Sequence, residues 1–147
     1  MSEPERSPGP PQWIQVAAVL YGLPFIWVGV QHFIQPEVFE PLVPPWLGWP
    51  WFWVHITGYT EVGLGVGIMV PRLRRVAGWL MVAQLLLLYL ANLHMWMADV
   101  PFQGIQMGTV GHIIRLLVQL LLIAAAVGLA RSARRSTSTA DETALPG

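Results

Sequence analysis

The chain has no cysteine and no lysine among its 147 residues. The absence of cysteine excludes disulfide bonds, metal sites built on thiolates and dithiol redox chemistry. Any redox role would therefore need a cofactor or a partner that carries the electrons. The absence of lysine leaves eight arginines as the only strongly basic side chains, so the distribution of positive charge can be read from them alone.

Charged residues are also scarce, at 11% of the chain, whereas hydrophobic residues make up 54%. Soluble domains carry about a quarter charged residues. Four apolar runs of 20 to 22 residues cover 13–34, 51–70, 76–97 and 109–130. A helix of that length reaches about 30 Å, the thickness of a bilayer core. These runs predict an all-α, polytopic membrane protein folded as a four-transmembrane-helix bundle.

The arginines indicate how the bundle is oriented. Six of the eight lie in the segments 71–75 and 131–135, and Arg6 precedes the first run. The loops 35–50 and 98–108 contain acidic residues but no basic one. Because short cytoplasmic loops collect Lys and Arg, both termini are predicted to be cytoplasmic. The expected location is the bacterial inner membrane, in a multi-pass arrangement.

The same runs define the domain organisation. Four spans use most of the chain, so residues 13–130 are predicted to form a single transmembrane domain. The flanking segments 1–12 and 131–147 are rich in Pro, Ser, Thr and charge, and we expect both to be disordered tails. Nothing in the composition indicates nucleic-acid binding, and the principal contact of the chain is with membrane lipid.

Small residues indicate how the spans meet. Gly63 and Gly67 form a GxxxG pair, and Ala124 and Gly128 repeat this spacing in the last span. Such faces let helix backbones approach closely in lipid, so the second span is expected to be central, and the Gly63/Gly67 face is a candidate for homo-oligomer contact. The alternative is that glycine is simply common in membrane helices.

The first outer loop, residues 35–50, combines several prolines with tryptophans and is expected to lie in the membrane interface. Its aromatic residues are interpreted as an anchoring belt, or alternatively as part of a lid over a cavity that opens outward.

Four histidines lie at one depth, within about 6 Å of the outer edge of the hydrocarbon by the rise per residue. They are His32, His55, His94 and His112. Imidazoles that converge inside a bundle could ligate a transition metal or a haem. The alternative is that histidine is amphipathic and tolerated near the interface, with no ring pointing inward.

Glu61 lies near the middle of the second span, where an ionisable group is costly and marks a candidate functional site. Arg115 is the arginine expected to pair with it, and Asn92 lies close to the histidine layer. The pair could simply hold two spans together. Alternatively, this group of residues could bind an anionic or quinone-like head group or move a proton.

The order of these residues resembles a known family. The positions that carry the resemblance are Gly29, His32, Phe33, Pro36, Phe39, Val43, Pro44, Gly58, Glu61, Gly65, Pro71, Arg72, Arg75, Ala91, Asn92 and Met95. With this spacing, residues 29 to 97 resemble the DoxX-like membrane proteins, a family of small four-helix membrane proteins. Some relatives are similar to a subunit of thiosulfate:quinone oxidoreductase, others belong to oxidative-stress complexes, and distant eukaryotic ones assist receptor assembly.

The resemblance implies His32, Glu61 and Asn92 as site residues, while the other three histidines are not part of the pattern. The resulting hypothesis is an accessory or quinone-interacting subunit of a membrane redox system with a polar pocket near the outer leaflet. His32, Asn92 and Arg115 would bind the head group and Glu61 would handle the proton. The alternatives are a non-catalytic assembly factor and a small-solute or metal carrier, and against the carrier stands the lack of evident inverted repeats.

Overall fold

A computed structural model describes residues 11–102 and 104–142, and this part of the chain is helical without a β-strand. The four long helices are α1 (Gln12–Ile34), α3 (Pro50–Met69), α4 (Arg74–Met97) and α5 (Thr109–Glu142). Between α1 and α3 lie the short helix α2 (Pro36–Phe39) and two 3-10 turns, η1 (Glu40–Leu42) and η2 (Pro45–Leu47).

Three helices in the described ranges are long and apolar enough to cross a membrane, namely Gln12–Ile34, Arg74–Met97 and Thr109–Ala133. The sequence predicted four such spans. The helix α3 forms where the remaining span was expected, but it is not among these three. Its hydropathy is lowered by Glu61, by His55 and by threonines and glycines along its length.

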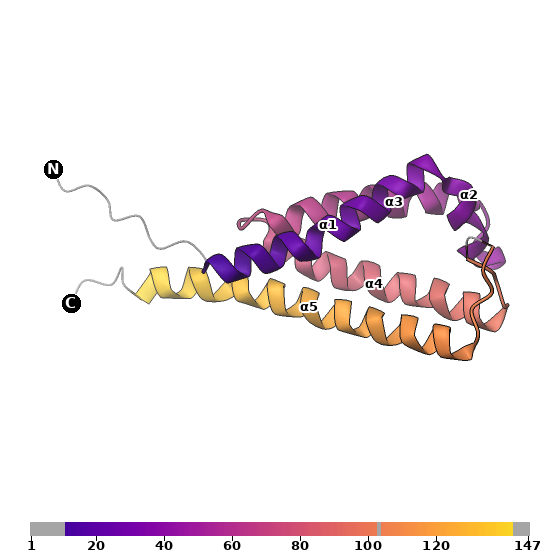
Figure 1. Cartoon of the computed structure of the whole chain (residues 1–147). Helices are drawn as coiled ribbons and strands as arrows, with labels where there is room; N and C mark the ends of the chain where they lie inside the picture. Colours follow the sequence, from indigo (N-terminus) through magenta and orange to yellow (C-terminus); the bar gives the residue numbers. More distant parts are fainter. Residues whose placement is uncertain (1–10, 103, 143–147) are drawn as a thin grey trace.

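The helices form two antiparallel pairs, with α1 along α3 and α4 along α5, and the contact of α3 with α4 joins the pairs (Figure 1). We call the end that carries α2 and the segment 98–108 the loop end, and the opposite end the tail end. The two pairs lie close together at the tail end and diverge toward the loop end (Figure 1).

The apolar core follows this arrangement. Its buried side chains are Ile14, Ala18, Phe25, Ile68, Ala77, Met81, Leu85, Ala126 and Leu129. Most of these residues lie in the first turns of α1 and α4, the last turn of α3 and the tail-end part of α5. Hydrophobic packing therefore holds the tail half of the bundle together, while polar residues become frequent toward the loop end.

Glycines set the distance between α1 and α3. A Cβ atom on Gly22 would lie 2.5 Å from the carbonyl oxygen of Gly65, and one on Gly29 would lie 2.9 Å from that of Gly58. In each helix the two glycines are seven residues apart, which is about two turns, so they share one face. The two backbones therefore touch, as small residues allow in lipid.

The expected Gly63/Gly67 face is divided between two environments. Gly67 packs on α4, where its Cβ position is 2.8 Å from Cβ of Ala77, but nothing lies within 4 Å of the Cβ position of Gly63. In the last span, Ala130 of α5 packs on Gly78 of α4, while the Cβ position of Gly128 is open. The GxxxG spacing thus located one packing glycine, Gly67, whereas Gly63 and Gly128 have open Cβ positions.

Arg74 closes the tail end of α3. Its side chain is only 1% exposed. The guanidinium donates to the carbonyl oxygens of Ile68 at 2.9 Å and Met69 at 3.5 Å, and to Oε1 of Gln15. Gln15 in turn donates to Met69 O at 2.9 Å. A cation at a helix carboxyl terminus binds carbonyls that have no partner within the helix.

The helix α5 runs to Glu142, beyond the predicted end of the span at residue 130. The helix thus covers 131–142 of the segment expected to be a disordered tail, and no glycine or proline interrupts the sequence there. Residues 143–147 lie outside the described part of the chain. At the amino end, residues 1–10 of the predicted tail 1–12 also lie outside the described part of the chain.

Candidate functional site

His32 and Glu61 meet on the glycine-lined face between α1 and α3. Helical side chains lean toward the amino end of their helix, so His32 leans into the bundle and Glu61 leans toward the loop end. Nδ1 of His32 lies 3.4 Å from Oε2 of Glu61, and the two residues are 5% and 3% exposed. Because both side chains are buried, water does not screen the contact.

The imidazole is oriented by its own helix. Nδ1 of His32 donates to the carbonyl oxygen of Val28 at 2.9 Å. This bond assigns a proton to Nδ1 and leaves Nε2 to accept a hydrogen bond or to bind a second proton. His32 can therefore act as an acceptor when neutral and as a donor when protonated.

The carboxyl group of Glu61 is incompletely satisfied. Its Oε2 is buried and has no hydrogen-bond partner in the described chain, since the Nδ1 proton of His32 is directed to the carbonyl oxygen of Val28. A buried polar atom without a partner is costly, more so for an ionised one. Such a group is chemically suited to hold a transferable proton or to bind a ligand that supplies the missing bond.

Two aromatic rings, Phe39 of α2 and Phe102 of the second loop, extend from His32 in a series of contacts. The His32 ring stacks on Phe39 with centroids 3.8 Å apart and planes 19° apart. Phe39 meets Phe102 edge to face at 6.3 Å, and the guanidinium of Arg115 lies 5.0 Å from the centre of the Phe102 ring. One series of contacts thus connects Glu61 to Arg115 across the loop end.

Arg115 does not pair with Glu61, and the predicted ion pair is wrong. In the described chain the guanidinium contacts sulfur, with Nη1 at 3.2 Å from Sδ of Met95 and 3.9 Å from that of Met107. The reason is the helix pairing: α5 packs on α4, whereas the face of α3 that carries Glu61 packs on α1. The charge of Arg115 at the loop end is therefore not neutralised by Glu61.

Asn92 lies outside this group of contacts. Its amide donates to Oε1 of Gln119, and Gln119 donates to the carbonyl oxygen of Leu85 at 2.6 Å. These bonds link α4 to α5. The predicted site residues therefore divide: His32 and Glu61 touch, Arg115 joins them through two rings, and Asn92 serves a separate helix contact.

The four histidines do not converge. His55 donates from Nδ1 to the carbonyl oxygen of Trp51 at 2.8 Å, and His112 stacks on Trp96 with centroids 5.7 Å apart. His94 and His112 each have a buried Nδ1 without a partner among the described residues. Over the described ranges, no three His, Asp or Glu side chains are grouped to hold a metal ion.

Sequence reasoning missed the ring of Phe102 and two interior glutamines, Gln84 and Gln119, and it named Phe39 only as a position of the family resemblance. The glutamines had a signal, because each is a polar side chain inside an apolar run, as Glu61 is. Phe102 had no such signal, because its role depends on how two loops fold over the bundle.

A family model described as a domain of unknown function (DUF8561) matches residues 21–130, and the chain belongs to that family. The match includes the whole group of contacts from His32 to Arg115. No curated protein and no solved structure matches the chain.

Proposed function

We propose that this DUF8561 member is an accessory subunit of a membrane redox system and binds the head group of a quinone at its loop end. The observation that carries the proposal is the buried Oε2 of Glu61, which lacks a hydrogen-bond partner among the described residues and lies beside His32, whose ring stacks on Phe39. The resemblance to DoxX-like proteins supports the same two residues and stays a prediction.

The chemistry of a quinone suits these groups. Its planar ring can stack on Phe39 or Phe102, and its carbonyl oxygens accept hydrogen bonds from Arg115 or from a protonated His32. Reduction adds two electrons and two protons, and the hydroxyl of the reduced form can donate to Nε2 of His32. Glu61 would supply or take up a proton. The electrons must come from a partner, because the chain has no cysteine and the proposal assigns it no redox cofactor.

We further propose that α3 crosses the membrane with the other three long helices, with both termini cytoplasmic. The contacts of Gly22 with Gly65 and of Gly29 with Gly58 keep α3 alongside α1 over several turns, so α3 occupies the same depth as a helix that is long enough to span. The arginine distribution supports the assignment of the loop end to the outer side of the membrane.

The orientation is testable because the natural chain has no cysteine. Single cysteines at Glu40 and Asp99 should react in intact cells with a maleimide that cannot cross the inner membrane. Cysteines at Arg75 and Ser132 should react only after lysis. Labelling of Arg75→Cys in intact cells would contradict the orientation.

The ligand prediction is tested by gentle extraction with lipid retained. A quinone should copurify with the wild-type protein and be identified by mass spectrometry, and His32→Ala should lower its occupancy of the site at His32 by about tenfold or more, the equivalent of one or two hydrogen bonds. His55→Ala is the matched control, because His55 makes the same bond to its own helix but has no carboxyl group beside it. Equal retention in all three proteins would show that His32 is not part of the quinone site.

The second candidate function is a non-catalytic assembly factor. It is favoured by polar links at two of the three main helix contacts: Thr60 with Gln84 joins α3 to α4, and Asn92 with Gln119 joins α4 to α5. Interhelical hydrogen bonds of this kind hold bundles together without any ligand. This function becomes the better account if no small molecule copurifies with the protein.

A further inference from the structure

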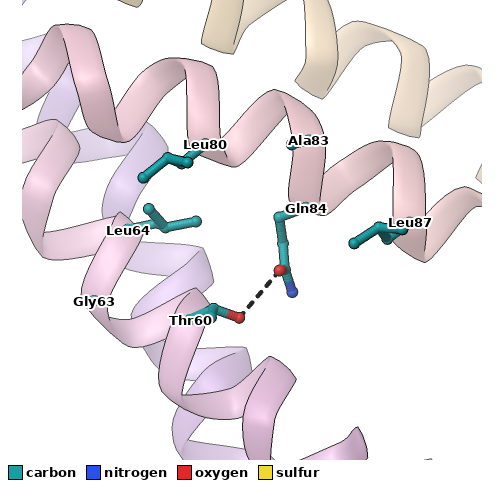
Figure 2. A pocket seen from close by; sticks show the side chains of 7 residues that line it. All are labelled: Thr60, Gly63, Leu64, Leu80, Ala83, Gln84 and Leu87. Carbon is teal, nitrogen blue, oxygen red and sulfur yellow. Dashed lines mark hydrogen bonds between the residues drawn. The ribbon is translucent and has the colours of Figure 1, made fainter.

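A groove opens between α3 and α4, apart from the His32 site. Its volume is about 320 Å³. The lining side chains are Thr60, Gly63, Leu64, Leu80, Ala83, Gln84 and Leu87 (Figure 2). Leu80 and Leu87 at its edges are exposed, so the groove opens onto the surface that faces lipid in a membrane-spanning bundle.

One polar group in the groove is unsatisfied. The side chain of Gln84 is 8% exposed, and its Oε1 accepts a hydrogen bond from the hydroxyl of Thr60 at 3.0 Å. Its Nε2 is buried and has no partner within the part of the chain that the structure describes. Figure 2 shows the amide nitrogen on the side away from α4, facing the space between the two helices. A buried donor without an acceptor calls for a ligand that carries one.

The depth of Gln84 limits what that ligand can be. Gln84 is ten residues from the start of α4, or about 15 Å along a helix, which is half the thickness of a bilayer core of about 30 Å. Phospholipid head groups lie in the interfacial layer, too far away to reach it. The acceptor must belong to an uncharged molecule that enters the hydrocarbon.

We propose that this groove is a second binding site, in which the ring of a quinone lies at mid-membrane and one carbonyl oxygen accepts from Nε2 of Gln84. Leu64, Leu80 and Leu87 contact the ring and the start of its chain. The ligand class rests on the proposed function, whereas the site rests on its own residues. The volume is near the lower limit of small-molecule sites, which suits one ring.

A helix from a second copy of the chain is the competing occupant. The backbone carbonyls of a membrane helix are already bonded within that helix. Such a partner could accept from Nε2 of Gln84 only through a polar side chain, whereas a quinone supplies two carbonyl acceptors of its own, so the unpaired amide favours the quinone.

Gly63 gives a direct way to fill the groove. Because nothing lies within 4 Å of its Cβ position, Gly63→Leu adds a side chain inside the groove without a clash in the bundle. Gly128→Leu is the matched control, since Gly128 has an equally open Cβ position but does not line the groove. Gln84→Leu removes the donor, and Thr60 keeps the carbonyl oxygen of Ile56 as an acceptor at 3.0 Å.

The test is a count of bound ligand by native mass spectrometry, with the full chain in lipid nanodiscs titrated with a decyl-substituted benzoquinone. We expect two bound molecules in the wild type and in Gly128→Leu, one in Gly63→Leu and one in His32→Ala. Gln84→Leu should weaken the second binding event by about tenfold, the effect of one buried hydrogen bond. Unchanged helical content and thermal midpoint show that the variants are folded.

The outcomes separate the two sites. Two molecules in Gly63→Leu would overturn the groove proposal, as would a single wild-type molecule lost only in His32→Ala. A single wild-type molecule lost only in Gly63→Leu would support the groove and overturn the site at His32. If Gly63→Leu instead splits an oligomer and leaves the ligand count unchanged, a second copy occupies the groove and the proposal is wrong.

Discussion

Gly65→Val is expected to separate α1 from α3 and to lower the free energy of unfolding by about 3 kcal/mol, the upper part of the usual range for overpacking. The reason is that the contact is with backbone. The Cβ position of Gly65 is 2.8 Å from the carbonyl oxygen of Gly22 and 3.3 Å from the backbone nitrogen of Ile26. Neither atom can rotate away as the end of a flexible side chain would. Thermal unfolding in a mild detergent measures the loss.

Gly63→Val is the matched control for this variant. Gly63 is two residues from Gly65 on the same helix, but its Cβ position has no neighbour within 4 Å. The two substitutions make the same chemical change and differ only in what the added side chain meets. A similar loss in both variants would show that valine weakens the helix itself and that α1 and α3 do not touch through Gly65.

Arg74→Leu is expected to be nearly as damaging, with a loss of about 3 kcal/mol. The substitution removes the donors to the carbonyl oxygens of Ile68 and Met69 and leaves Gln15 without its guanidinium partner. Those oxygens lie at the buried end of α3, where water cannot easily replace the lost bonds. The thermal midpoint in detergent should fall clearly below that of the wild type.

Arg75→Leu is the control, because Arg75 is adjacent in the sequence but exposed. It should leave the midpoint nearly unchanged. Gln15→Leu should cost less than Arg74→Leu, and the double variant should cost less than the sum, because the two side chains share one network. Additive losses, or equal losses from Arg74→Leu and Arg75→Leu, would contradict the capping role.

The helices were predictable because the length and polarity of an apolar run decide whether a segment forms a helix in lipid. The runs 13–34 and 76–97 differ from α1 and α4 by at most two residues at their ends. Glu61 was predictable for the related reason that a carboxyl group inside such a run is rare. These properties belong to single segments and can be read directly from the sequence of each segment.

The partner of Glu61 was not predictable because it depends on which helix faces α3 and in what register. That register is set by glycines seven residues apart, Gly22 with Gly29 and Gly58 with Gly65. The four-residue GxxxG spacing does not reveal this register. Arg115 was expected opposite Glu61 because it is the one arginine outside the segments assigned to the cytoplasm, and the structure has His32 in that place.

The measurement that tests the central proposal most directly is photoaffinity labelling with an azido-substituted quinone in native membranes. Gly63→Leu protein should be used, so that the groove between α3 and α4 does not contribute. Labelled peptides are then mapped by mass spectrometry, with and without an excess of unlabelled quinone. The account predicts competed labels in 36–42 and 95–107, the segments that carry Phe39 and Phe102. Labels confined to the exposed side chains Leu117, Val118, Leu120 and Leu121 of α5, or labels that unlabelled quinone does not reduce, would contradict it.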